Sequence, residues 1–299
     1  MGAAQCSASH CDCPKGGVDN ASVVEDRLNP SAKVLASLGP AYVFEDGARY
    51  SGQWQNGMRH GFGIHIEVDG STYEGNWQDD KAHGSGRLQH ADGASYEGAW
   101  QGSMKHGEGT YVHSDGSRYS GLWKHDLQNG QGTEVWSDGA AYTGQYLNGR
   151  KNGRGKYTWP NGSFFEGDFL DNDIHGQGTY TWPDGCVYEG QWIKQQMEGT
   201  GVFKYPDGRV YKGSYVKSQK HGEGTLQWPD GRKFEGQWAL GEMNGKGVMT
   251  ETDGTRRIRF LGLARGDVEA GASSQSIASE RWFPKVAIRG RTSKVANHL

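Results

Sequence analysis

The fold is decided by the stretch from Tyr73 to Ser95, YEGNWQDDKAHGSGRLQHADGAS, because this stretch recurs along the chain. With its aromatic residue taken as position 1, nine units follow one another every 23 residues without insertion. We number them units 1 to 9. They begin at Tyr50, Tyr73, Tyr96, Tyr119, Tyr142, Phe165, Tyr188, Tyr211 and Phe234. Such a period indicates a repeat architecture in which each unit packs on its neighbours.

Glycine occupies positions 3, 12, 14 and 21 of every unit, and position 20 is always Asp or Asn. Positions 1, 3 and 5 alternate along the chain, so rings such as Tyr96 and Trp100 share one strand face. A second strand is expected over residues 109–114. Asp115-Gly116 then supplies positive φ for a tight turn into the next unit. Each unit is therefore predicted to be one antiparallel β-hairpin.

The predicted fold class is all-β, an elongated single-layer antiparallel meander of tandem hairpins with a short capping helix and flexible tails. Eighteen strands at about 4.8 Å spacing would extend roughly 85 Å. We expect a disordered tail over residues 1–28, a short capping helix or linker over 29–41, the repeat array over 42–260 and a basic tail over 261–299. The sheet is expected to start near Tyr42 and to close with a strand over 256–260.

Composition excludes several classes of protein. The chain has 49 Gly and 11 Trp but few aliphatic residues, so its apolar contacts must come mainly from aromatic rings. It has no run of 18 apolar residues and no apolar region typical of a signal peptide. Three of the four Cys fall within the first thirteen residues, which makes a disulfide framework improbable and favours a reducing, intracellular setting.

The pattern Tyr-Glu-Gly-x-Trp, then His-Gly-x-Gly, then Asp-Gly resembles the MORN (membrane occupation and recognition nexus) repeat. Unit 2 shows the match in Tyr73-Glu74-Gly75-Asn76-Trp77, His83-Gly84-Ser85-Gly86 and Asp92-Gly93. The resemblance covers residues 42–256. It implies an elongated β-repeat module that organises cytoskeletal, ciliary or membrane-junction assemblies, with phosphoinositide affinity as a further option. It does not choose a partner.

The units differ at positions 18 and 19, which bear on binding. Units 5 to 8 have an aromatic-Pro pair at these positions, whereas position 5 keeps an aromatic ring in all nine units. The position-1 and position-5 rings are interpreted as core. For the position-18 rings a core role and a ligand-binding role are both consistent with the sequence. The predicted partner-binding residues are Trp136, Trp159, Trp182, Tyr205 and Trp228.

No catalytic or metal site is predicted. Histidines recur at position 11, but equivalent residues of adjacent hairpins lie about 9.6 Å apart, too far to share one ion. The Gly-x-Gly pairs never extend to G-x-G-x-x-G, and no helix follows them to hold a phosphate. The position-2 carboxylates are read as an exposed, solvated face. We expect no cofactor and no enzyme activity.

The N-terminus is a candidate lipid anchor. Gly2 begins a sequence similar to a myristoylation site, except that Cys6 stands where Ser or Thr is preferred. Cys6, Cys11 and Cys13 are candidate palmitoylation sites, and two lipid signals are needed for stable anchoring. An unmodified tail and a zinc cluster of the three Cys with His10 are the alternatives.

The C-terminus is basic, with nine Lys/Arg and three Asp/Glu in residues 255–299. Such a tail favours anionic membrane lipids over nucleic acid, since no nucleic-acid fold accompanies it. The tail residues considered are Arg281, Lys285, Arg289, Arg291 and Lys294.

The function predicted is a non-catalytic scaffold that links a membrane to cytoskeletal or ciliary protein partners. We expect it to be cytoplasmic, either as a peripheral membrane protein or in association with a cilium or the cytoskeleton. The alternatives are a phosphoinositide-binding module associated with a phosphatidylinositol-phosphate kinase and an axonemal, radial-spoke-like component. A homodimer is also possible on this reading.

Overall fold

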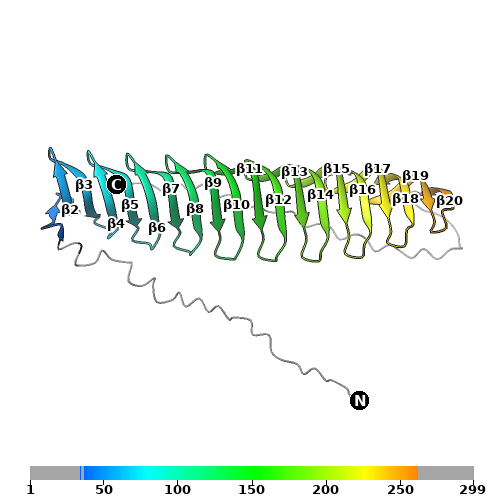
Figure 1. Ribbon diagram of the computed structural model, residues 1–299, viewed down its shortest axis with the longest axis horizontal. Coiled ribbons are helices and arrows are strands. Elements are labelled where there is room, and N and C mark those ends of the chain that lie inside the picture. The colour runs from blue at the N-terminus through cyan, green and yellow to red at the C-terminus, as the bar shows by residue number, and fades with distance from the viewer. Residues whose placement is uncertain (1–33, 35–36, 262–299) are drawn as a thin grey trace, which may run out of the picture.

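The computed structural model describes residue 34 and residues 37–261 of the chain. These residues form one open sheet of 20 strands, in which each strand pairs antiparallel with the next strand along the chain. Figure 1 shows the strands lying across the long axis of a rod. The predicted meander is confirmed.

The strands have these bounds: β1 Tyr42–Val43, β2 Arg49–Gln55, β3 Met58–Ile66, β4 Thr72–Gln78, β5 Lys81–Gln89, β6 Ser95–Gln101, β7 Met104–Val112, β8 Arg118–Lys124, β9 Leu127–Val135, β10 Ala141–Leu147, β11 Arg150–Thr158, β12 Phe164–Leu170, β13 Asp173–Thr181, β14 Val187–Ile193, β15 Gln196–Lys204, β16 Val210–Val216, β17 Gln219–Gln227, β18 Lys233–Ala239, β19 Glu242–Thr250 and β20 Arg256–Leu261. Each complete unit contributes a strand of seven residues followed by a strand of nine residues.

The second strand of a unit begins earlier than predicted. In unit 3 it is β7, Met104–Val112, instead of 109–114, so the Gly-x-Gly pair lies inside the strand. The two strands of a unit are joined by two residues, at positions 7 and 8, that take positive φ. In unit 2 these are Asp79 (φ 51°) and Asp80 (φ 64°), and Asn56 in unit 1 has nearly the same φ (52°) as Asp79. Positive φ at both residues identifies the type I′ turn, whose twist matches that of a hairpin.

The Asp-Gly pair forms the other turn of the array. In unit 3 the Gly116 N–H donates to the His113 carbonyl (2.9 Å), and the His113 N–H donates to the Ser117 carbonyl (2.7 Å). Gly116 has the predicted positive φ (83°), and the Asp115 carboxylate accepts from the Ser117 N–H (2.9 Å). This is a three-residue hairpin loop that ends in a left-handed glycine. The Asp or Asn at position 20 is thus required as a hydrogen-bond acceptor.

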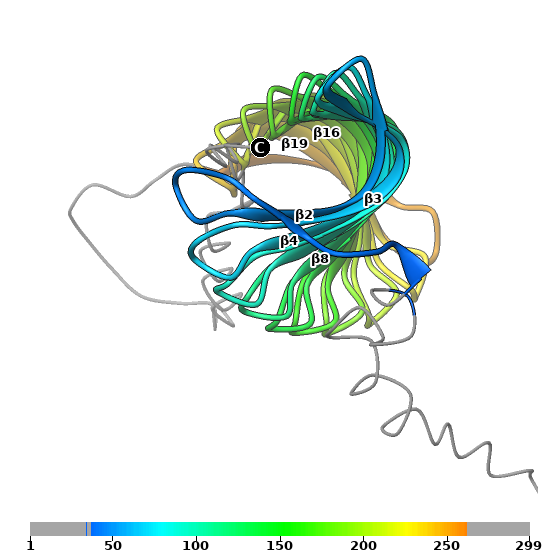
Figure 2. The ribbon, with the colours of Figure 1, turned by 90° about the vertical axis from the view of Figure 1, so that its left-hand side faces the viewer.

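The core is a zigzag of rings from positions 1 and 5 that runs the length of the array. Tyr73 is fully buried and packs edge-to-face against Trp77 in its own unit (4.9 Å between centroids) and Trp100 in the next (5.3 Å). The Tyr73 ring lies over the paired Gly75 and Gly86, and a Cβ on Gly86 would collide with the Tyr73 hydroxyl. Glycine is needed at positions 3 and 14 because the core ring occupies the space of a side chain there. Figure 2 shows the resulting curvature of the strands in end view.

The ends of the array are only partly described. Val34 and Ser37 are helical, and the Ser37 hydroxyl donates to the Val34 carbonyl (2.7 Å), but the other residues of the predicted capping helix lie outside the described part of the chain. β1 leads into the first unit, and Tyr42 packs on Trp54 (5.5 Å). Within the described residues, no helix has the length and hydropathy needed to span a membrane.

Candidate interaction surface

A second series of rings follows the Asp-Gly edge of the middle units. It alternates between positions 16 and 18, with centroid separations between 4.4 and 5.4 Å and tilted planes. Unlike the core zigzag, it is confined to units 4 to 7. Its members in order are Trp136, Tyr157, Trp159, Tyr180, Trp182, Phe203 and Tyr205.

The predicted partner-binding residues differ in exposure. Trp136 is 3% exposed and belongs to the core, which leaves almost no ring surface for a partner. Trp159, Trp182, Tyr205 and Trp228 are half-buried and pack against the core from one side. We call these four residues the aromatic row. Arg209 stacks on Tyr205 (4.5 Å) and Arg232 lies over Trp228 (5.5 Å), so the last two rings are partly covered.

The prolines that follow the row have a structural role. Each stands at position 19, the second residue of a turn closed by the glycine N–H at position 21 and the carbonyl at position 18, as in Gly185 to Trp182 (3.0 Å). Proline favours this place because its fixed φ suits the turn. The rings themselves are not required there, since Glu67, His90 and His113 form the same turn in units 1 to 3.

Units 4 and 5 meet at a buried ion pair that the sequence did not reveal. Lys151 is 1% exposed, and its Nζ lies 3.3 Å from Glu134 Oε2, which also accepts from the Tyr146 hydroxyl (3.0 Å). The ammonium group also lies over the Trp136 ring (4.7 Å). Burial lowers the pKa of Lys151, while Glu134 acts in the opposite direction. Lys105 and Lys220 are buried among rings at the same position of units 3 and 8.

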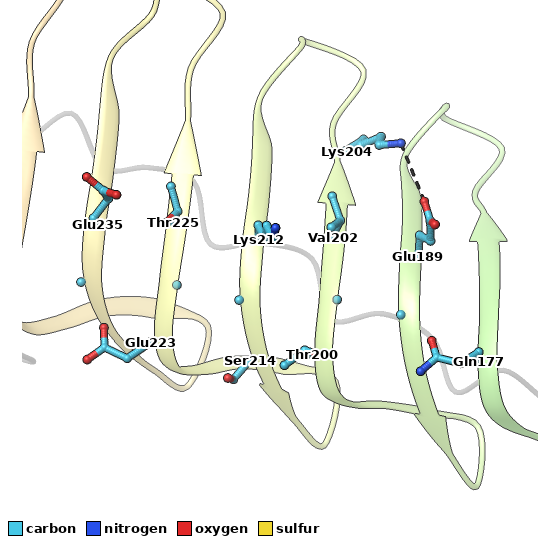
Figure 3. A pocket seen from close by; sticks show the side chains of 15 residues that line it. Gln177, Glu189, Thr200, Val202, Lys204, Lys212, Ser214, Glu223, Thr225 and Glu235 are labelled. Carbon is cyan, nitrogen blue, oxygen red and sulfur yellow. Dashed lines mark ion pairs between the residues drawn. The ribbon is translucent and has the colours of Figure 1, made fainter.

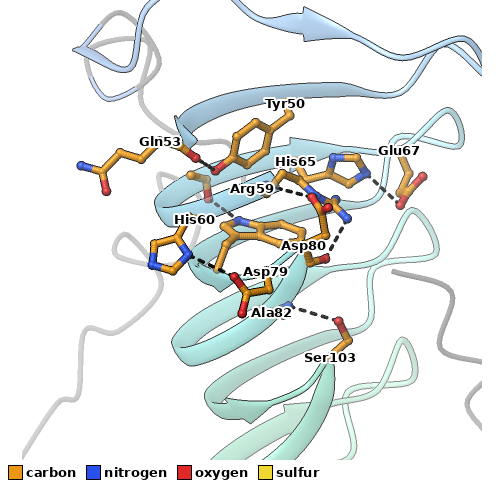
Figure 4. Close-up of polar contacts among 12 residues, drawn as sticks. Tyr50, Gln53, Arg59, His60, His65, Glu67, Asp79, Asp80, Ala82 and Ser103 are labelled. Atoms are coloured by element: carbon orange, nitrogen blue, oxygen red, sulfur yellow. Dashed lines mark hydrogen bonds and ion pairs between the residues drawn. The ribbon is translucent and has the colours of Figure 1, made fainter. Parts of the chain in front are cut away.

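Polar contacts also order the first unit, as Figure 4 shows. The Arg59 guanidinium packs on Trp77 (4.1 Å), and its Nε lies 3.3 Å from the Asp80 carboxylate. His65 Nε2 lies 3.0 Å from Glu67, and burial lowers the pKa of His65. These residues hold neighbouring turns together, which favours a structural role.

The face opposite the core carries two open grooves of about 990 and 800 Å³. Figure 3 shows the larger one, which crosses β13 to β18 and is lined by Thr, Glu and Lys side chains and by glycine backbone. Glu189 lies 3.9 Å from Lys204 there, and Glu166 lies 4.0 Å from Lys156 in the other. The carboxylates are thus placed beside cations on an open surface.

The position-11 histidines lie inside the second strands. His60 is part of β3, with Nδ1 3.8 Å from the Asp79 carboxylate. His106 lies beside His125 (5.5 Å between ring centroids). Across the part of the chain that the structure describes, no group of three or more His, Cys, Asp or Glu is placed to hold a metal ion.

Two further sets of predicted residues lie outside the described residues: the lipidation candidates Gly2, Cys6, Cys11 and Cys13, and the basic-tail residues Arg281, Lys285, Arg289, Arg291 and Lys294.

One exposed feature was not recognised from the sequence. Position 6 changes from Gln or Lys in units 1 to 4 to Leu, Ile or Val in units 5 to 8. Its alternation with the buried position 5 could have revealed this.

The nine units are also matched by a family model. The MORN repeat model matches residues 50–72, 73–95, 96–118, 119–141, 142–164, 165–187, 188–208, 211–231 and 234–256. The chain therefore belongs to the MORN-repeat family. This membership defines a repeat-based module of a kind that binds proteins or associates with membranes. A comparison with curated proteins found no match.

Solved structures show only a distant likeness. The TCP10 domain of Danio rerio CPAP in complex with a peptide of Danio rerio STIL is 11% identical, with 74% of this chain and 99% of that chain covered and a TM-score of 0.38. The TCP domain of Drosophila melanogaster SAS-4, in complex with a proline-rich motif of Ana2, is 11% identical, with 67% and 90% covered and a TM-score of 0.33. Likeness at these TM-scores carries no argument about function.

Proposed function

We propose that this protein is a non-catalytic scaffold that binds a protein partner through the aromatic row of units 5 to 8. One observation carries the proposal: the row consists of rings that its turns do not need. The Trp182 turn and the His90 turn have the same two backbone hydrogen bonds, with lengths within 0.1 Å of each other (2.9 and 3.0 Å against 2.8 and 3.0 Å). Half-buried Trp and Tyr held by a rigid scaffold are favourable anchors for a partner.

The proposed scaffold also links its partner to a membrane at the cytoplasmic side, with cytoskeletal or ciliary proteins as the partner class. The sequence supports this link through Gly2 and the neighbouring cysteines. Family membership is consistent with either protein binding or membrane association. Fractionation of the wild type, a Gly2→Ala form and a Cys6/Cys11/Cys13→Ser form tests the anchor. Equal membrane association of all three forms would exclude it.

Partner binding is tested in the full chain by replacing residues of the aromatic row with the residues that unit 2 has at the same positions. Trp182→His/Pro183→Ala and Trp228→His/Pro229→Ala install the His-Ala pair found at His90-Ala91. We expect quantitative affinity capture from cells to lose at least one specific partner by about tenfold or more, in line with the loss of an aromatic anchor. The matched control, His90→Glu, installs the residue that unit 1 has at this position and should retain every partner.

Trp182→Tyr separates binding from stability, because unit 7 has Tyr205 at the same position. This variant should fold and retain partners. If the His-Ala variant, with melting temperature and secondary structure close to wild type, captures the same partners as wild type, the aromatic row is not the binding site.

A further inference from the structure

A second exposed row lies on the other edge of units 5 to 8. We call it the apolar row; its members are Leu147, Leu170, Ile193 and Val216, at position 6. Their exposed fractions are 51%, 46%, 51% and 42%. Units 1 to 4 have exposed Gln55, Gln78, Gln101 and Lys124 at this position, in the same strand and register. The fold therefore does not require apolar residues there.

The row is evenly spaced on the scale of a peptide ligand, and polar side chains stand between its members, since Leu170 pairs with Asp173 and Ile193 with Gln196. Each member ends a first strand and adjoins a two-residue turn, and successive members are two strands, or about 9.6 Å, apart. In unit 9 the row is followed by Leu240, which is 63% exposed and has a φ of 54° that is unfavourable for leucine. Exposed apolar side chains that recur in register over four consecutive units differ from the singly scattered ones that need no explanation.

The described chain ends at the same edge. β20 is the first strand of an incomplete tenth unit, and Leu261 pairs with Gly245 as Trp238 pairs with Gly222 in the unit before. Leu261 is therefore at position 5, the position that directly precedes the row in each unit. From there Val216 is two units away, about 19 Å, and Leu147 is five units away, about 48 Å.

The chain beyond residue 261 contains a segment whose chemistry matches the row. Residues 281–291, Arg-Trp-Phe-Pro-Lys-Val-Ala-Ile-Arg-Gly-Arg, combine four large apolar side chains with four cations. The 19 residue steps from 262 to 281 span up to about 63 Å when extended, enough to reach every member of the row. The apolar residues are Trp282, Phe283, Val286 and Ile288.

Charge at the border of the row is complementary to this segment. Positions 4, 7, 9 and 11 of units 5 to 9 carry five carboxylates and three cations. The carboxylates are Asp168, Asp171, Asp173, Glu198 and Glu242, and the cations are Arg150, Lys194 and Lys217. Arg150 lies 3.4 Å from Asp171, and Arg154 at position 13 lies 3.4 Å from Asp168. A basic apolar segment is thus attracted chiefly to Asp173, Glu198 and Glu242 while its rings cover the row.

We propose that residues 281–291 bind the apolar row of the same chain. The short tether keeps the segment at high effective concentration near the row, which favours its own chain over a second copy. A ligand that captures the basic segment would then expose the row. This contact is separate from the aromatic row, which lies along the Asp-Gly turns.

Hydroxyl-radical footprinting of the full chain measures side-chain exposure directly. We expect oxidation of Leu170 and Ile193 to rise severalfold in the Trp282→Ser/Ile288→Ser variant compared with the wild type. Val68 in unit 1, which is 68% exposed, is the internal control and should not change. Equal oxidation of the row in both proteins would overturn the proposal.

A photo-crosslinking amino acid in place of Trp282 tests whether residues 281–291 are the segment that binds the apolar row. We expect links within one chain to peptides of units 6 to 8, and their loss in Leu170→Gln/Ile193→Gln, which installs the residue of units 1 to 3. Gln78→Leu is the matched control and should leave the links unchanged. A mixture of isotopically light and heavy chains separates links within a chain from links between chains. Links between chains, links spread evenly over the array, or none would each overturn the proposal.

Discussion

Units 1 to 4 and units 5 to 8 have the same strands, turns and core zigzag, yet they present different surfaces. At position 18 the first three units have Glu67, His90 and His113, whereas units 5 to 8 have the aromatic row. At position 6 the first half is polar and the second half is apolar. Because the backbone is the same, the hairpin fold does not require these differences. The four predictions that follow test where the two halves differ and where they do not.

The largest effect is expected at the boundary between the halves. Lys151→Ile alone leaves Glu134 buried without its cation and should lower the free energy of unfolding by about 3–5 kcal/mol. The triple variant Glu134→Tyr/Tyr146→Phe/Lys151→Ile reproduces the next junction, where Tyr157, Phe169 and Ile174 take these places, and should recover most of the loss. Denaturant unfolding measures both. A single variant as stable as the wild type would show that the ion pair is not needed.

The shared core predicts equal effects in the two halves. A methyl group added by Gly86→Ala collides with the Tyr73 hydroxyl, and one added by Gly178→Ala collides with the Phe165 ring. Each variant should lose about 1–3 kcal/mol because the core is already filled. Hydrogen exchange resolves the loss by unit. A cost in one half that is more than about twice that in the other would contradict a common core.

Acid should weaken the first half more than the second. Burial holds the pKa of His65 and of His90 below 6.5, so the unfolded chain takes up protons first as the pH falls below 6.5. Stability that is present above pH 6.5 is therefore lost below it. We expect the denaturant concentration at the unfolding midpoint of units 1 to 3 to decrease as the pH is lowered from 7.5 to 5. His65→Phe, which installs the residue of unit 7, should reduce this dependence; an unchanged pH profile would contradict the assignment.

The smallest effect is expected at position 6. Gln78→Leu and Leu170→Gln exchange residues between the halves on an exposed face and should change the free energy of unfolding by no more than about 0.5 kcal/mol. Thermal unfolding of both variants measures this. A larger loss for Leu170→Gln would mean that the apolar row contributes to folding and is not free to evolve as a binding surface.

The strands were predictable because their signals are local. Ring, glycine and Asp-Gly recur at fixed positions, and each has a defined role in the hairpin. The two-residue turns were missed because positions 7 and 8 vary, from Asn56-Gly57 to Lys194-Gln195, and positive φ is imposed there by the hairpin twist. The start of the second strand was predicted too late because a Gly-x-Gly pair inside a strand resembles one in a turn.

The candidate site was less predictable because burial depends on neighbouring units. Trp136 and Trp182 look alike in sequence, but Trp136 is enclosed by Lys151 and Tyr157 while Trp182 is half-buried. Lysine side chains are normally exposed because they are charged, so the sequence alone does not show that Lys105 and Lys151 are buried. Lipid anchoring and membrane association remain predictions.

The orientation of the sheet has a mechanical consequence. Since the strands lie across the rod, their hydrogen bonds run along it, and tension between the two ends would pull adjacent strands directly apart instead of shearing them. A released unit of 23 residues would replace about 10 Å of rod with roughly 76 Å of extended chain. Under load the molecule would lengthen unit by unit, and so limit the force passed between whatever is attached at its ends.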